Sequence, residues 1–127
     1  MHRQIAPPSL GPPAANYAHA MLTTGATAWL HTSGVVATRH DGTVPESLHD
    51  QAELIWANLG EMLREAGMQV TDVVSVVTYV VVGNDLATVM AARDRALGTH
   101  RAASTLVPVP ALAQPRWHME IAIVAAR

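Results

Sequence analysis

The run from Val73 to Val82 limits the possible folds of this 127-residue chain more than any other feature. It is ten residues long and nearly apolar, broken only by Ser75 and Thr78. A helix needs about 20 apolar residues to span a bilayer, so we expect no membrane span here. Because β-branched residues favour strands, the valines predict a central β-strand with both faces covered.

A long amphipathic helix is predicted just before this strand. From Leu48 to Ala66, apolar residues recur mostly at spacings of three and four. Ser47 followed by Asp50 is a variant of the helix N-cap box, and Gly67 is placed to end the helix. A single apolar face predicts that this helix covers a sheet.

The remaining elements complete one α+β domain over residues 1–127. Four of the eight prolines fall within the first 13 residues, so residues 1–15 should be irregular, with at most a short edge strand. The other predicted elements are an edge strand near Arg3–Ala6, a hairpin of Tyr17–Thr23 and Thr27–Ala37, a helix over Leu86–Leu97 capped by Asn84 or Asp85, and strands over Ser104–Val109 and His118–Ala125.

The composition excludes several chemistries. The chain has no lysine, so it forms no lysine Schiff base, and it has no cysteine for a thiolate nucleophile, a disulfide or an iron–sulfur cluster. None of the seven histidines pair at HxH or HxxxH spacing, and we expect no metal site. A net charge of -2 disfavours nucleic-acid binding. The N-terminal residues lack a continuous apolar segment, and we expect a cytoplasmic protein.

Glu120 is the clearest candidate for chemistry. Strand alternation puts Met119 and Ile121 on one face, whereas Glu120 shares the other face with small or apolar neighbours such as Ala122. Partial burial suits a carboxyl group to acid or base work on a bound water or a substrate nitrogen. The alternative is an ordinary surface glutamate on an edge strand.

Six short segments, in order from about residue 16 to the end, resemble the RidA/YjgF family. They are Asn16-Tyr17-Ala18-His19-Ala20, Thr32-Ser33-Gly34, Glu65-Ala66-Gly67 followed by Thr71-Asp72-Val73-Val74, Asn84-Asp85-Leu86-Ala87-Thr88-Val89, Ala103-Ser104-Thr105-Leu106-Val107 and Met119-Glu120-Ile121-Ala122-Ile123. The resemblance implies a fold similar to the chorismate mutase type, with a six-stranded mixed sheet packed on two helices. It also implies a homotrimer with small-molecule clefts between subunits, which hydrolyses reactive enamines and imines to keto acids and ammonia without a metal or organic cofactor.

Residue by residue, the resemblance is incomplete. Glu120 matches the family's water-orienting glutamate, and Tyr17 and Ser33 match pocket residues. Ala103 stands where deaminases carry the arginine that binds the substrate carboxylate. Two further pocket positions also differ, because Met90 replaces an asparagine and Thr105 replaces a cysteine. We therefore expect weak or no activity on 2-iminopropionate.

Three residues are candidates to replace the missing arginine: Arg101, His118 and Trp117. Arg101 lies two residues before Ala103 and points to the same side of an extended strand, but it also fits a solvated loop. Two functions stay open: a RidA-like hydrolase with altered substrate choice, or a non-catalytic trimer that binds a small molecule. RNA cleavage ranks last, because the chain carries no basic stripe.

Overall fold

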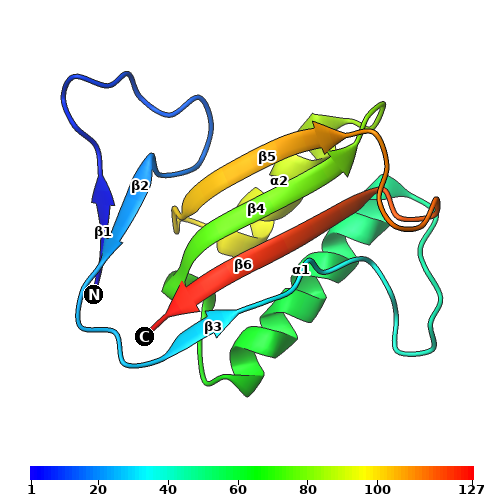
Figure 1. Ribbon diagram of the computed structural model, residues 1–127, viewed down its shortest axis with the longest axis horizontal. Helices are drawn as coiled ribbons and strands as arrows, with labels where there is room; N and C mark the ends of the chain where they lie inside the picture. The colour runs from blue at the N-terminus through cyan, green and yellow to red at the C-terminus, as the bar shows by residue number, and fades with distance from the viewer.

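The computed structural model describes residues 1–127 and has an α+β architecture with six strands and two α-helices (Figure 1). The elements in chain order are β1 (His2–Ile5), β2 (Ala20–Thr23), β3 (Trp29–His31), α1 (Leu48–Glu65), the 3-10 turn η1 (Val70–Asp72), β4 (Val73–Val81), α2 (Leu86–Leu97), β5 (Ala103–Val109) and β6 (Met119–Ala126). The predicted fold class and the number of strands are confirmed.

The strands form two sheets. The larger is mixed and has the order β3-β6-β4-β5, in which β4 and β5 are parallel and the other neighbours are antiparallel. Helix α2 makes the crossover between the two parallel strands, as parallel pairing requires. The smaller sheet is the ribbon of β1 and β2. A bridge between Ala18 and Ala103 connects the segment before β2 to the free edge of β5.

The predicted hairpin of Tyr17–Thr23 with Thr27–Ala37 is wrong. Strand β2 pairs with β1, while β3 pairs with β6. The pairing with β6 places Leu30 opposite Ala125, where Leu30 packs against the core. The β1–β2 ribbon is attached through His2, whose ring contacts the Ala126 carbonyl at 2.9 Å. The packing of Leu30 against the core therefore favours pairing of β3 with β6 over the local hairpin between β2 and β3.

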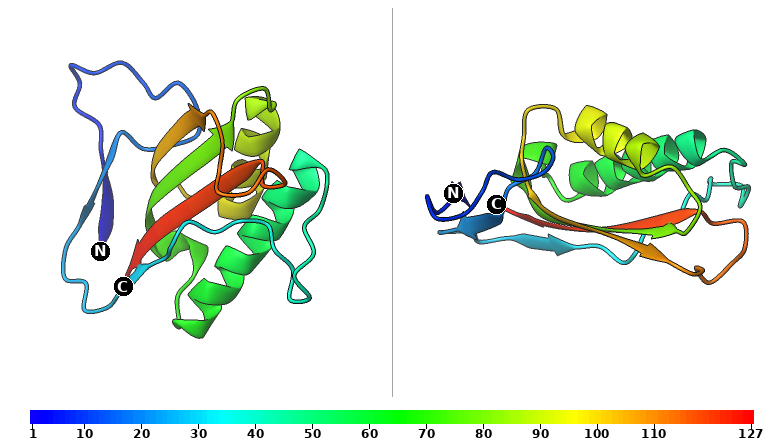
Figure 2. Two further views of the ribbon diagram at one scale, coloured as in Figure 1. Left: turned by 45° about the vertical axis from the view of Figure 1, so that its right-hand side comes forward. Right: turned by 90° about the horizontal axis from the view of Figure 1, so that it is seen from above.

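Both helices lie on one face of the larger sheet (Figure 2). Ile55 and Leu59 of α1 are fully buried, and Val76, Ile121 and Ile123 from the sheet belong to the same core cluster. Full burial of one such side chain contributes about 1.5–3 kcal/mol. Neither helix is long and apolar enough to cross a membrane.

The opposite face of the sheet is bare, which corrects the prediction for β4. This strand is central as expected, but only its helix-facing side is covered. On the other side, Tyr79 and Val107 are exposed and Val77 is half-buried. We call this surface the open face. A valine-rich strand with one uncovered side leaves an exposed apolar patch, which is typical of an interaction surface.

The helix ends follow the sequence closely. The Ser47 hydroxyl accepts a hydrogen bond from the Asp50 amide at 3.1 Å, as the cap motif predicted. Asp85 caps α2, whereas Asn84 donates to the Val81 carbonyl instead. Gly98 follows α2 with a φ of 60°, in the region that glycine tolerates best.

Candidate functional site

Glu120 lies on the open face, and its carboxyl group occupies the space above Gly34. In strand register it stands opposite Tyr79. A Cβ atom built on Gly34 would lie 2.2 Å from Oε2 of Glu120 and 2.4 Å from its Cδ. Only glycine leaves room for the carboxylate in this position.

A β-bulge produces this close approach. The Thr32 amide donates to the Ile123 carbonyl at 3.0 Å, and Val35 and Ile121 exchange amide-to-carbonyl bonds at 2.7 and 3.0 Å. Ser33 and Gly34 therefore stand opposite the single residue between Ile121 and Ile123. Such bulges re-aim side chains next to functional sites. Ser33 is exposed and directly precedes Gly34, over which the glutamate lies.

The Glu120 carboxylate has no hydrogen-bond donor and no ion-pair partner within the chain. Its side chain is nevertheless half-buried, over Gly34 of the bulge and among the small side chains of β6. A carboxylate only accepts hydrogen bonds, with room for about four. Its acceptor sites are therefore available to a water or a ligand on the open face.

Gln51, which sequence reasoning missed, anchors the loop that leads into β6. It is fully buried, and its amide nitrogen donates to the carbonyls of Pro45 and Arg116, each at 2.8 Å. Its side-chain oxygen accepts from the His118 amide at 2.9 Å. A glutamine on the apolar face of α1 was the available signal, because a buried amide must have partners.

His118 and Trp117 lie at the same end of the sheet as Glu120. The His118 ring contacts the Glu46 carbonyl at 3.1 Å, in the loop that precedes α1. Trp117 is half-buried, and its indole N–H is buried without a partner. Within one copy, the His118 ring is thus held by the loop that precedes α1.

A second group of predicted residues lies at the free edge of β5. Ala103 begins this strand, half-buried between Ser75 of β4 and Ala18. The Ala18 amide donates to the Ala102 carbonyl at 2.9 Å, and this bond brings the neighbouring Tyr17 to the same edge. The Tyr17 hydroxyl accepts a bond of 3.3 Å from the backbone nearby, and its ring meets that of His19 edge-on.

The other predicted binding residues separate into two cases. Met90 is half-buried on α2, and Thr105 is exposed on β5 opposite Val77. Arg101, by contrast, donates to the carbonyls of Gly98 at 2.8 Å and His100 at 3.2 Å. These bonds fix Arg101 in the loop after α2, where it is half-buried.

The two groups do not meet within one chain. Glu120 is aligned with Tyr79, whereas Ala103 is aligned with Ser75, four residues away along β4. Strand β4 also separates β6 from β5. With about 3.3 Å per residue and 4.8 Å per strand, Glu120 and Ala103 are roughly 16 Å apart. A site that uses both groups needs a second copy of the chain.

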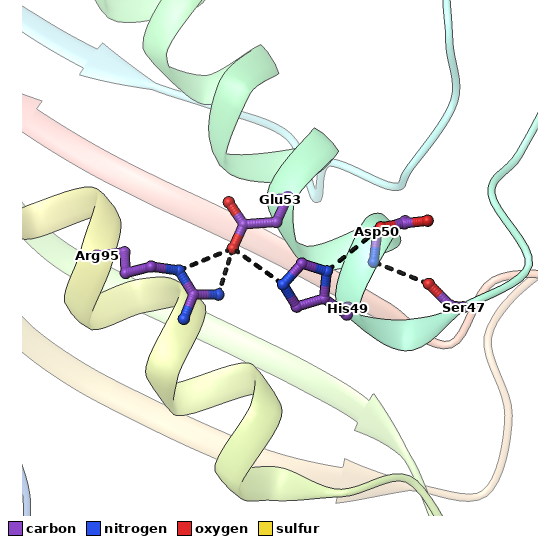
Figure 3. A network of polar contacts seen from close by, with 5 residues as sticks. All are labelled: Ser47, His49, Asp50, Glu53 and Arg95. Carbon is purple, nitrogen blue, oxygen red and sulfur yellow. Dashed lines mark hydrogen bonds and ion pairs between the residues drawn. The ribbon is translucent and has the colours of Figure 1, made fainter.

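The hollows of a single copy lie elsewhere. A groove of about 290 Å³ runs between α1 and α2, and a shallow hollow of about 540 Å³ lies beside Leu30 and Met62. Arg95 lines the groove and donates through Nε to Glu53 at 3.0 Å, in a polar network with His49 and Asp50 (Figure 3). No predicted site residue lines either hollow. No three His, Asp or Glu side chains are grouped so that they could hold a metal ion.

The family model described as Endoribonuclease L-PSP matches residues 9–127. This chain belongs to the RidA/YjgF family. A Rid-family protein of unknown function from Yersinia pestis, YyfB, shares 32% identity over 99% of this chain and 98% of its own, with a TM-score of 0.88. TdcF from E. coli, solved with bound serine, shares 25% identity over 96% of this chain and 93% of its own, with a TM-score of 0.72.

RidA from an Antarctic Psychrobacter has the same fold as this RidA-family chain. The TM-score is 0.74 at 21% identity, over 98% of this chain and 99% of that one. No match was found among curated proteins.

Proposed function

We propose that this RidA-family protein hydrolyses a small imine- or enamine-type metabolite in a cleft between two copies of the chain, with Glu120 orienting the attacking water. The observation that carries the proposal is the Glu120 carboxylate above Gly34, half-buried and without a donor in its own chain. A side chain in this situation holds its acceptor atoms ready for a water on the open face.

The chemistry needs one group that accepts a proton and returns it. Water adds to the carbon of the carbon–nitrogen double bond, and the carboxylate takes a proton from the water as the C–O bond forms. The same carboxyl group then protonates the nitrogen, which gives a carbinolamine with one hydroxyl and one amino group. The carboxylate next takes the hydroxyl proton and passes it to the amino group, so that the C–N bond breaks, ammonia leaves and the C=O bond forms. One imine and one water thus give one ketone and one ammonia. An enamine first gains a proton on carbon and loses one from nitrogen to become the imine.

The proposed assembly is a homotrimer, and two features of the chain support it. Glu120 and Ala103 lie roughly 16 Å apart by strand spacing, so a second copy is needed to unite them. The open face presents Val77, Tyr79 and Val107 without cover from this chain. Serine bound to TdcF, a relative, agrees with a small ligand of amino-acid size.

Ala103 sets the choice of substrate in this proposal. A guanidinium binds a carboxylate through two parallel charged hydrogen bonds, which alanine cannot make. Losing one partner of such a pair costs about 2–5 kcal/mol of binding. The usual imino acids should therefore be poor substrates, and 2-iminopropionate should turn over weakly or not at all.

The test follows release of ammonia and of the carbonyl product from a panel of imines with and without a carboxylate, with the uncatalysed rate subtracted. Glu120→Gln should lower the rate on the best substrate about 10²–10⁴-fold, because an amide takes no proton from water. Glu65→Gln, an exposed change on α1, is the matched control and should keep the full rate. Unchanged turnover by Glu120→Gln would exclude this mechanism.

The alternative is a non-catalytic trimer that binds a small, weakly polar molecule. Ala103 and Met90 favour it, because both positions lack the polar groups of deaminases and apolar linings favour apolar ligands. Calorimetric binding of a metabolite that is never converted would support this alternative over hydrolysis.

Cleavage of RNA, the activity in the family description, has little electrostatic support here. The net charge is -2, and phosphate binding relies on unpaired basic side chains. Three of the eight arginines are paired with acids, in the pairs Arg64 with Glu61, Arg93 with Asp94 and Arg95 with Glu53.

A further inference from the structure

Arg93 of α2 is a buried charged side chain that has no role in the proposed hydrolysis. Only 8% of its side chain is exposed. Its Nε and Nη2 atoms both donate to Oδ1 of Asp94, at 3.2 and 3.1 Å. Its Nη1 atom has only the Ser104 hydroxyl, at the long distance of 3.5 Å.

The count of donors shows that one edge of the guanidinium is unused. Arginine has five N–H groups, and Asp94 takes one from Nε and one from Nη2. Three remain, two on Nη1 and one on Nη2, and Ser104 can accept only one of them closely. The end of the fork formed by Nη1 and Nη2 therefore has unmatched donors in a buried position, which is unfavourable without a partner.

This edge lies next to the group of site residues at β5. Ser104 directly follows Ala103, the position that lacks the family's arginine. The second oxygen of Asp94 accepts a bond of 3.0 Å from Asn16, the neighbour of Tyr17. Met90 lies one helical turn before Arg93 and so shares its side of α2. The guanidinium thus contacts the strand neighbour of Ala103 from the helix side of the sheet, one helical turn from Met90.

Asp94 decides which chemical group suits this edge. Its carboxylate already neutralises Arg93, and it would lie close to any second carboxylate bound to the same guanidinium. Like charges at such a distance repel strongly where water is partly excluded. A neutral carbonyl oxygen accepts from the free N–H groups without this repulsion. An amide adds an N–H donor for the acceptors beside it, which are Ser104 and Asp94.

From this arrangement we infer that Arg93, held by Asp94, selects a neutral carbonyl-bearing substrate, such as an imino amide, over the corresponding imino acid. The inference rests on the proposed function for the identity of the site. Asp94 is 35% exposed and forms the more solvent-exposed side of the pair. Arg93 binds at a point displaced from position 103, on the helix side of β5.

Pyruvamide and pyruvate test the inference directly, because they have nearly the same shape and differ in charge, and each resembles a hydrolysis product. Titration calorimetry on the assembled protein should show pyruvamide binding at least tenfold more tightly than pyruvate. Asp94→Asn removes the charge but keeps an oxygen for the Arg93 bonds. This change should lower the preference at least tenfold by improving pyruvate binding, whereas a purely structural role for Asp94 would not.

The controls lie in the polar network of Figure 3, away from β5. Asp50→Asn and Arg95→Gln should leave the preference unchanged, while Arg93→Gln should lower pyruvamide affinity at least tenfold. If Arg93→Gln fails to fold, the Asp94→Asn comparison still decides. Equal or tighter binding of pyruvate by the wild-type protein, no change in Asp94→Asn, or no pyruvamide binding at millimolar concentration would each overturn the inference. These readouts involve no turnover, so failure of hydrolysis is a separate result.

Discussion

Replacing Gly34 by alanine tests the proposed role of Glu120 most sharply. The new methyl carbon would lie 2.2 Å from Oε2, 2.4 Å from Cδ and 2.8 Å from Cγ of Glu120. Ordinary contact begins at about 3.4 Å, so the carboxyl group must move by roughly 1 Å. A misplacement of that size can lower a catalysed rate about 10²-fold.

The same change should have little effect on stability. Gly34 does not have a positive φ, so alanine adopts its backbone conformation without strain. The methyl group meets the movable end of a side chain rather than backbone. A Gly→Ala change at a compatible position raises the free energy of unfolding by about 0.4–1 kcal/mol, which offsets the cost of moving Glu120.

The assay pairs ammonia release on the best substrate with thermal unfolding. Gly60→Ala is the control, because a Cβ atom at this position of α1 meets nothing within 4 Å. We expect Gly34→Ala to lose about 10²-fold in kcat at an unchanged melting temperature, and Gly60→Ala to keep its activity. Full activity in Gly34→Ala would refute the placement of Glu120, and loss of folding would refute the assessment of strain.

Two further outcomes can be measured on the same protein. Hydrogen bonds from the Thr88 hydroxyl and, to a smaller extent, from the Ala87 amide stabilise the ionised form of Asp85 and lower its pKa below 3.8. The folded state is therefore stabilised by this group above pH 3.8, and the stabilisation is lost as the pH falls through the lowered pKa. Asp85→Asn should therefore melt at a lower temperature than wild type at neutral pH, and the difference should shrink as the pH falls below 3.8; a constant difference would contradict this. Val77→Glu puts a charge on the open face and should separate the copies in analytical ultracentrifugation while far-UV circular dichroism stays unchanged, whereas an intact assembly would exclude this face as the interface.

Most of the local structure was predictable, because its causes lie close together in the sequence. Ser47 caps α1 through its own neighbour Asp50, and α2 spans the predicted residues, Leu86–Leu97. Alternation along β6 correctly separated the buried Ile121 from the half-buried Glu120. The period of a helix or strand is a local property, so short segments reveal it.

The arrangement of the candidate site was harder to predict from the sequence, because it depends on contacts between distant segments. Gly34 belongs to one of the segments that resemble the family. The reason that this position requires glycine appears only in the folded chain, where Glu120 of β6 occupies the space that a side chain would need. The pairing of Arg93 with Asp94 involves sequence neighbours, but its relation to Ser104 and Asn16 requires α2, β5 and the N-terminal segment to meet. The periodic patterns of helices and strands do not reveal such tertiary contacts.

By itself, the sequence determined the element types, the Ser47 cap and the alternation that separates Glu120 from Ile121, since each follows from side chains within a few residues of one another. It also excluded lysine and cysteine chemistry outright. Only the tertiary structure decided that β3 pairs with β6, that a bulge brings Gly34 under Glu120, and that Glu120 and Ala103 lie on different parts of the sheet. The physical reason is that strand partners are chosen by the burial of side chains far apart in the chain, such as Leu30 against the core formed by β6 and α1.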